Sequence, residues 1–339
     1  MWRNFFCGVL LLLGWPHEAR AQAVVRDDFS LAHLSPKIWF ACRRPENVMA
    51  VVARPGGGRA ARLVAHAVKP KRLELEEYLV GERHGACIDR HGKYTPDGDQ
   101  RAEIWEKREL AQGFGTETWI QFEFMVASPP PGALVPRLVI GQLKADGDHS
   151  PVLAQRFTGR HFMVTLGQDN DSPDRHPDDK DCRVIVAHDA SLLARGEPLE
   201  GSVGQDARDV VHEPKNPSGV HEPDEPPGVH APRRGCKRDI EVDARELLPS
   251  PFDNWVRMTY RIRPGIADGL LEVWADGQLI AKAAGRIGYR DNVAGRQYFK
   301  FGPYADPAPY DLKAYLARYR RAPTCARLGD PSAAECRAK

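Results

Sequence analysis

Tyr298-Phe299-Lys300-Phe301-Gly302-Pro303-Tyr304 is the stretch from which both the fold and the function hypotheses start. Successive side chains of a β-strand point to opposite faces. A strand here places two phenylalanines on one face, where they suit an apolar core, and the polar side chains on the other. The polar face consists of Tyr298, Lys300, Gly302 and Tyr304. Phenols and an ammonium group suit the binding of an acidic sugar and transfer of its proton, although an ordinary exposed strand face is the structural alternative.

Alternating segments recur on both sides of this stretch. The clearest is Thr118 to Val126 (TWIQFEFMV), in which Ile120, Phe122 and Phe124 share one face. Further strands are predicted at Gln100 to Glu106, Arg137 to Leu143, Arg160 to Leu166, Trp255 to Arg263 and Leu270 to Ala275. Turn residues separate these segments, and helical periodicity is nearly absent, so the pattern indicates an all-β sandwich or jelly roll. Leu312 to Arg321 fits either a short helix or a final strand.

The first 21 residues have the pattern of a secretory signal peptide. Arg3 precedes an apolar run from Phe5 to Trp15, and Ala19-Arg20-Ala21 resembles a cleavage site. We therefore expect a single mature domain at residues 22–339 that is secreted or periplasmic and leaves the membrane after cleavage. An uncleaved membrane anchor is the alternative.

One segment, from about residue 168 to about residue 251, interrupts the regular succession of predicted strands. It is rich in Pro, Asp, Glu and Gly and repeats a Val-His-Glu-Pro pattern from Val211 onward. Proline at this density opposes a packed core, so the segment is predicted to be a surface loop inserted in the domain. Local order is expected only between Val184 and Ala194. Repeated histidines could also bind a metal.

Six cysteines remain after removal of the signal peptide, an even number that favours disulfides in an exported protein. They are Cys42, Cys87, Cys182, Cys236, Cys325 and Cys336. Their order suggests the pairs 42–87, 182–236 and 325–336, although other pairings stay open. No cysteine or histidine spacing is typical of zinc, and no cofactor is required. Loose calcium binding by acids such as Asp169, Asp171 and Asp174 is conceivable, with loop solvation as the simpler explanation.

The charge balance gives no reason to expect a nucleic-acid partner. The chain has 48 Lys and Arg against 46 Asp and Glu. A local basic surface for an anionic glycan remains compatible with this balance. We expect a monomer.

Three further motifs accompany the first stretch in a fixed order. They are Gln100-Arg101-Ala102-Glu103, the Gly141-Gln142 pair, and Gly269-Leu270-Leu271-Glu272-Val273-Trp274-Ala275-Asp276-Gly277. Together they resemble the jelly-roll polysaccharide lyases, most closely the heparin lyase I-like branch, which is related to glucuronan lyase-like and alginate lyase-like enzymes. The resemblance runs from about Asp28 to about Tyr319. It implies a concanavalin-like β-jelly-roll sandwich and cleavage of a uronic-acid-containing polysaccharide by β-elimination.

The resemblance also implies roles for the first stretch. The heparin lyase-like pattern assigns function to Lys300 and Tyr304, whereas the alginate lyase-like pattern makes Tyr298 the base and acid. Both tyrosines are present here. Our hypothesis is that Tyr298 moves the proton, while Lys300 and Tyr304 support charge and position the substrate.

The chain departs from the family at one position. Gln142 matches a family glutamine that helps to bind the substrate carboxylate, but Lys144 stands where the family has a histidine. A protonated lysine is a poor base at neutral pH and a suitable partner for a carboxylate. His149, which lies nearby in the sequence, is a candidate replacement for the missing imidazole.

Four other side chains complete the predicted site. Arg101 is expected to hold the C5 carboxylate of the substrate, and Glu103 is expected to orient either this contact or Lys300. For both residues the alternative is a structural salt bridge on the sheet face. Trp105 is a candidate platform for a sugar ring or a core residue. Arg108 is a further candidate outside the main motifs.

Two other classes of function compete with the lyase. Glu241-Val242-Asp243-Ala244-Arg245-Glu246 resembles the paired-carboxylate signature of jelly-roll glycoside hydrolases, with Glu241, Asp243 and Glu246 as its acids. Arg245 departs from that signature. A non-catalytic glycan-binding module on the same scaffold is the third hypothesis, since the family histidine is missing.

Overall fold

The computed structural model describes residues 24–43, 47–55, 57–67, 100–131, 133, 137–145, 149–173, 180–193, 239–329 and 333–337. The predicted signal peptide lies outside these residues, as do Cys87, Asp174, Cys236 and the Val-His-Glu-Pro repeats.

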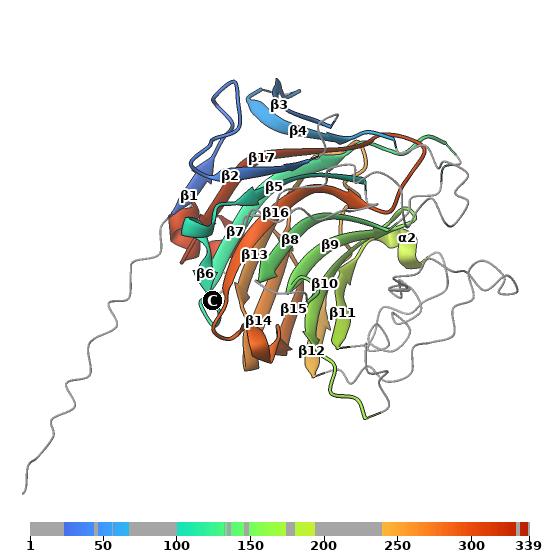
Figure 1. The fold of residues 1–339 in the computed structure, drawn as a ribbon. Helices are drawn as coiled ribbons and strands as arrows, with labels where there is room; N and C mark the ends of the chain where they lie inside the picture. The colour runs from blue at the N-terminus through green and yellow to red at the C-terminus, as the bar shows by residue number, and fades with distance from the viewer. Residues whose placement is uncertain are drawn as a thin grey trace, which may run out of the picture.

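Two antiparallel sheets pack face to face into a jelly-roll sandwich (Figure 1), as the sequence predicted. The first sheet contains, in spatial order, β12 (Ile240–Ala244), β15 (Gln278–Ile287), β14 (Gly265–Ala275), β13 (Val256–Arg263), β7 (Thr118–Val126), β17 (Leu312–Ala322), β4 (Arg59–Ala65) and β3 (Val48–Ala53), with β1 (Val25–Asp27) paired to β17. The second contains β11 (Asp181–His188), β10 (His161–Asp169), β9 (Leu153–Thr158), β8 (Leu138–Ala145), β16 (Arg296–Ala305), β5 (Gln100–Glu106) and β2 (Trp39–Arg43), with β6 (Gln112–Gly113) paired to β16. The short helical segments are η1 (Arg108–Leu110), α2 (Ala190–Leu193), η3 (Arg290–Asn292), η4 (Cys325–Leu328) and α4 (Ala334–Arg337). Of the described helices, none is long and apolar enough to cross a membrane.

The core between the sheets is built by alternating strands. Ile120, Phe122 and Phe124 of β7 are fully buried, as the alternation predicted. Phe122 packs against Phe299 and Phe301 of β16, with ring centroids 5.1 and 5.9 Å apart. Each such ring contributes roughly 1.5–3 kcal/mol by burial. Because these phenylalanines face the core, the polar side chains of β16 face the opposite way.

A buried ion pair joins the two sheets. The Glu106 carboxylate at the end of β5 lies 3.0 Å from Nε of Arg321 on β17, and both side chains are almost fully buried. Glu106 also accepts hydrogen bonds from the Tyr319 hydroxyl at 2.7 Å and from the Phe299 backbone N–H at 2.9 Å. Burial, and then the nearby carboxylate, raises the pKa of Tyr319 well above its ordinary value, so this phenol stays a donor. Glu106 thereby holds the backbone of β16 at Phe299, the residue between Tyr298 and Lys300.

Gly302 allows a close approach between β16 and β5. Its φ is 128°, and a Cβ there would lie 2.1 Å from the Ala102 carbonyl oxygen. The pairing of β16 with β8 shifts register between Phe301 and Tyr304, whereas Tyr304 keeps its partner Arg101 on β5. The strand therefore bulges at the glycine.

We expect Gly302→Ala to lower the free energy of unfolding by about 1–3 kcal/mol, because the added methyl group meets the neighbouring backbone in a conformation that favours glycine. Urea unfolding measures this loss. Gly113→Ala is the matched control, since its Cβ would meet only Thr116 Oγ1, at an ordinary 3.7 Å. Equal stability of the two variants would contradict the strain argument.

Part of the predicted loop insertion is sheet. β11 forms one edge of the second sheet and β12 one edge of the first. β11 buries Cys182, Val184 and Val186, so its apolar alternation prevails over the polar composition around it. The local order expected between Val184 and Ala194 agrees with β11 and α2, whereas the prediction of a surface loop is wrong for β12. Residues 194–238 lie outside the described part. The undecided segment at 312–321 is strand β17.

A disulfide joins Cys325 to Cys336, with the Cα atoms 5.3 Å apart, and this confirms the third predicted pair. Cys42 and Cys182 are also disulfide-bonded. Their predicted partners, Cys87 and Cys236, lie outside the described residues.

Candidate functional site

Strand pairing brings most of the predicted site residues to the outer face of the second sheet, the face turned away from the core. β16 lies between β5 and β8. Lys300 is paired with Trp105 on one side and with Gln142 on the other. Tyr298 is paired with Lys144, and Tyr304 with Arg101. Directly opposite residues of antiparallel strands point to the same face, so motifs far apart in the sequence meet here.

Glu103 is the buried centre of this group. Its side chain has no exposed surface. Gln142 Nε2 donates to one carboxylate oxygen at 2.8 Å, and Trp105 Nε1 donates to the other at 3.2 Å. Arg101 Nε lies 3.6 Å from that second oxygen. Glu103 therefore orients the amide and the guanidinium group.

Lys300 lies against aromatic rings. Its Nζ is 3.7 Å from the centre of the Trp105 ring and 5.7 Å from that of Tyr298. Both aromatic side chains are more than nine-tenths buried. Trp105 thus supports the ammonium group through a cation–π contact, and its face toward Lys300 is not open for stacking against a sugar.

Tyr304 lies between two arginines. The guanidinium carbons of Arg101 and Arg137 lie 4.1 and 4.7 Å from the centre of its ring. Arg137 also forms an ion pair with Asp306 at 3.0 Å. Sequence reasoning missed Arg137 as a site residue. Its contact with Tyr304 depends on the pairing of Val139 with Tyr304, for which the sequence alone gives no signal.

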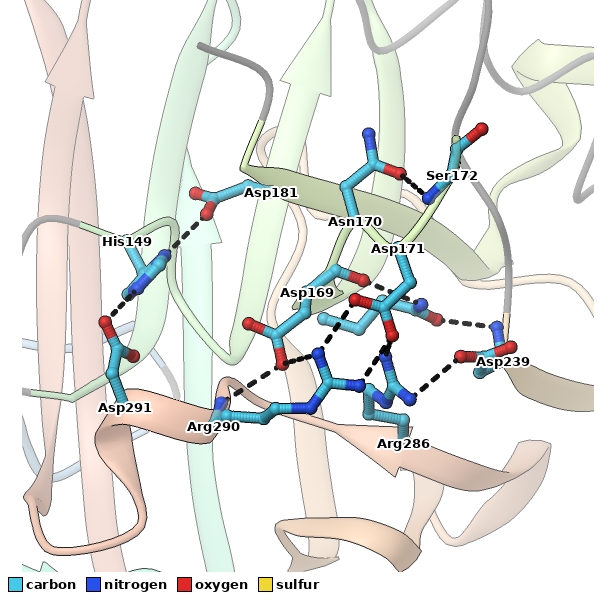
Figure 2. Close-up of polar contacts among 11 residues, drawn as sticks. His149, Asp169, Asn170, Asp171, Ser172, Asp181, Asp239, Arg286, Arg290 and Asp291 are labelled. Carbon is cyan, nitrogen blue, oxygen red and sulfur yellow. Dashed lines mark hydrogen bonds and ion pairs between the residues drawn. The ribbon is translucent and has the colours of Figure 1, made fainter. Parts of the chain in front are cut away.

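His149 does not take the place of a catalytic imidazole. Its two ring nitrogens lie 2.6 Å from Asp181 and 2.7 Å from Asp291 (Figure 2), and its backbone carbonyl accepts a hydrogen bond from Lys144 Nζ. Burial disfavours the charged ring, but the two carboxylates outweigh it and raise the pKa of His149 above its ordinary value. With both nitrogens bonded to acceptors, the ring cannot also accept a proton from a substrate.

Arg108 lies apart from these candidate residues. It lies in η1, two residues beyond the end of β5, and its side chain is exposed. No contact described for it involves another candidate side chain.

The carboxylates of the hydrolase hypothesis lie elsewhere in the sandwich. Glu241 and Asp243 belong to β12, at the edge of the first sheet, and both are exposed. Asp243 is paired with Arg245 at 2.8 Å. Glu246 lies beyond the strand and is also exposed. Exposed acids on an edge strand are not arranged as a general acid and a nucleophile flanking a substrate.

Two of the three acids considered for calcium are bound by arginines. Asp171 contacts Arg286 and Arg290, and Asp169 lies 3.9 Å from Arg290 (Figure 2). Hydrogen bonds from Arg290 and Arg286 hold the pKa of Asp171 well below its usual range. Within the described residues, no group of three or more His, Cys, Asp or Glu side chains is arranged to hold a metal ion.

Comparison with known proteins gives one match that covers most of the chain. The family model described as polysaccharide lyase matches residues 78–319, a range that contains β5, β8 and β16. A search of curated protein sequences finds no match.

Solved structures with a similar fold include several alginate lyases. Alginate lyase A1-II′, a member of polysaccharide lyase family 7, is 11% identical, with 84% of this chain and 94% of that chain covered and a TM-score of 0.42. The alginate lyase from Klebsiella pneumoniae is 10% identical, with 82% and 85% covered and a TM-score of 0.42. Alginate lyase AlgAT5 is 10% identical, with 84% and 94% covered and a TM-score of 0.41.

Proposed function

Because this chain belongs to the polysaccharide lyase family, we propose that it cleaves an acidic, uronate-containing polysaccharide on the outer face of its second sheet. The observation that carries the proposal is the position of Tyr304 between two guanidinium groups. Lys300 and Lys144 add two ammonium groups on the same face. Such a face attracts a polymer of carboxylates and suits the chemistry of β-elimination.

The reaction requires three events. The C5 carboxylate must be neutralised, the C5 proton must be removed, and the leaving glycosidic oxygen must be protonated. As the C5–H bond breaks, its electrons form the C4–C5 double bond, and the bond from C4 to the leaving oxygen breaks. One tyrosine can serve both proton steps, because the proton it takes from C5 is the one it returns to the leaving oxygen.

Arg101, Gln142 and Lys144 are the residues proposed to neutralise the carboxylate. Glu103 holds the first two in place. An arginine fork and an amide can each donate to a carboxylate, and an ammonium group adds a positive charge. Lys300 is proposed to stabilise the charge that develops on the substrate.

Tyr304 is the better candidate for the proton steps. Two guanidinium groups beside its ring would stabilise the negative charge that appears when the phenol loses its proton. Tyr298 is nearly fully buried in a cluster with Cys42 and Trp105, whereas Tyr304 is partly exposed. The sequence alone favoured Tyr298 for the proton steps, whereas the geometry favours Tyr304.

Incubation of the purified protein with glucuronan, alginate, heparin, heparan and pectate tests this function. We expect at least one polymer to yield the ultraviolet absorbance of an unsaturated uronate. The matched control is the same polymer with its carboxylates reduced to alcohols, on which no reaction is expected because the C5 proton is no longer acidic. Cleavage of heparin or heparan would support the resemblance to the heparin lyase I-like branch.

Other outcomes select other functions. New reducing ends without the ultraviolet absorbance would indicate hydrolysis and return attention to Glu241 and Glu246. Binding without cleavage would indicate a glycan-binding module.

We further propose that the protein acts outside the cytoplasm. The signal-like residues 1–21 and the disulfide between Cys325 and Cys336 support this location, because disulfides persist in oxidising compartments.

A further inference from the structure

His149 connects three segments that are separate in the sequence. The residue lies between β8 and β9, and its ring is bonded to Asp181, the first residue of β11, and to Asp291 in η3 (Figure 2). The ring also stacks on Tyr289, with centroids 4.3 Å apart and planes 11° apart. We call His149, Asp181 and Asp291 the His149 bridge.

Further contacts fix the bridge to β11. The Ser150 backbone N–H donates to Asp181 at 2.6 Å, and Arg183 donates to the Ser150 hydroxyl at 2.9 Å. Asp181 is largely buried, with a side chain 13% exposed, whereas Asp291 is 68% exposed. The bridge therefore has one anchored carboxylate and one carboxylate that faces solvent.

The backbone of the bridge touches the proposed active site. The His149 carbonyl accepts a hydrogen bond from Lys144 Nζ, and Lys144 is paired across the strands with Tyr298. An ammonium group has three donors, so this contact can orient Lys144 without using all of them. Whatever moves the His149 carbonyl also moves the ammonium group.

We propose that His149 is a positioning residue, whose doubly bonded ring holds the carbonyl that aims Lys144 at the substrate carboxylate. The inference rests on the proposed function for its catalytic meaning, but its structural content does not depend on activity. His149 touches no reacting atom, so its effect passes through Lys144.

The bridge depends on pH in a defined direction. His149 has a raised pKa in the folded protein, so the charged ring stabilises the bridge fully below the ordinary value of about 6.5. This stabilisation is lost as pH rises through the raised value, because the neutral ring keeps a single N–H donor. The charged and titratable groups described around the ring and the Tyr289 stacked on it are Asp181, Asp291, Arg183, Arg156 and Asp169, and Lys144 contacts the His149 carbonyl. Tyr289 is buried, which raises its pKa well above the ordinary value and keeps it neutral over this range.

A double-mutant cycle tests the proposal. We expect His149→Gln to lower kcat/KM for the uronate polymer about tenfold, because a misplaced Lys144 neutralises the C5 carboxylate less well. In a Lys144→Met background, His149→Gln should cost nothing more, because its effect acts through Lys144. The same cost in both backgrounds would overturn the proposal. His66→Gln is the matched control, since His66 forms a half-exposed pair with Asp311 that lies outside the site.

A second, milder variant keeps the proposal testable if His149→Gln fails to fold. Asp291→Asn removes only the solvent-facing charge of the bridge, and we expect the His149 ring to titrate at lower pH in this variant, as followed by NMR. The kcat/KM of the wild type should fall as the ring loses its proton, and that of Asp291→Asn should fall at lower pH. A ring titration unchanged by Asp291→Asn would contradict the bridge.

The outcomes separate this inference from the proposed function. If the wild type cleaves no polymer, the proposed function fails, and the Lys144 ammonium resonance then decides the positioning question. We expect its chemical shift to change in His149→Gln and to be the same in His66→Gln as in the wild type. An unchanged Lys144 resonance in His149→Gln would overturn the positioning role regardless of activity.

Discussion

Replacing Tyr304 with phenylalanine is expected to lower kcat for β-elimination about a thousandfold, because the variant loses the group proposed for both proton steps. The ring and its contacts with Arg101 and Arg137 can remain, since these contacts involve the aromatic face. The fold should therefore survive and KM should change little. The initial rate of unsaturated-uronate absorbance, measured on the best polymer of the panel, gives kcat and KM.

Two matched variants make this result specific. Tyr298→Phe should cost far less, because Tyr298 packs in a cluster with Cys42 and Trp105 and is nearly fully buried. Tyr315→Phe should leave the rate unchanged, since Tyr315 lies on β17 in the first sheet and packs against Trp255. A large loss in Tyr298→Phe together with a small one in Tyr304→Phe would reverse the roles and favour the alginate lyase-like pattern.

Replacing Glu106 with alanine is expected to lower the free energy of unfolding by about 3–5 kcal/mol, because Arg321 would be left buried without its counter-charge. The Tyr319 hydroxyl and the Phe299 N–H would lose their acceptor as well. Urea unfolding followed by circular dichroism measures the loss. Since Phe299 lies between Tyr298 and Lys300, we also expect weaker activity at temperatures where the variant is still folded.

Glu241→Ala is the control for this stability loss. Glu241 is an exposed carboxylate on edge strand β12, and substitutions at such positions usually change stability by less than about 0.5 kcal/mol. If Glu106→Ala were no more destabilising than Glu241→Ala, the buried pair would not hold the sheets together.

Alternation of side chains made much of the fold predictable. Thr118–Val126 and Gln100–Glu106 are strands with the predicted bounds, and Phe299 and Phe301 face the core. Strand β12 was missed, and β11 was expected only as a locally ordered segment, because short strands in a segment rich in Pro and Asp give little pattern above their surroundings. Their place is set by neighbours in the sheet, which a single sequence does not reveal.

The polar contacts at the site were only partly predictable. The shared face of Tyr298, Lys300 and Tyr304 follows from strand period alone. Arg137 beside Tyr304 and Arg321 beside Glu106 depend on register between strands far apart in the chain. His149 became a candidate through its closeness to Lys144 in the sequence, but the carboxylates at both ring nitrogens come from distant segments that the sequence does not connect to it.

The order of strands in the sandwich also constrains how the protein folds. β16 and β17 are the last strands along the described chain, yet β16 lies between β8 and β5, and β17 between β7 and β4. β17 also pairs with β1, with Val25 opposite Arg321. During synthesis from the N-terminus, therefore, neither sheet can close until nearly all of the described chain is available. We expect folding to be slow and to begin late, because its central pairings join distant residues.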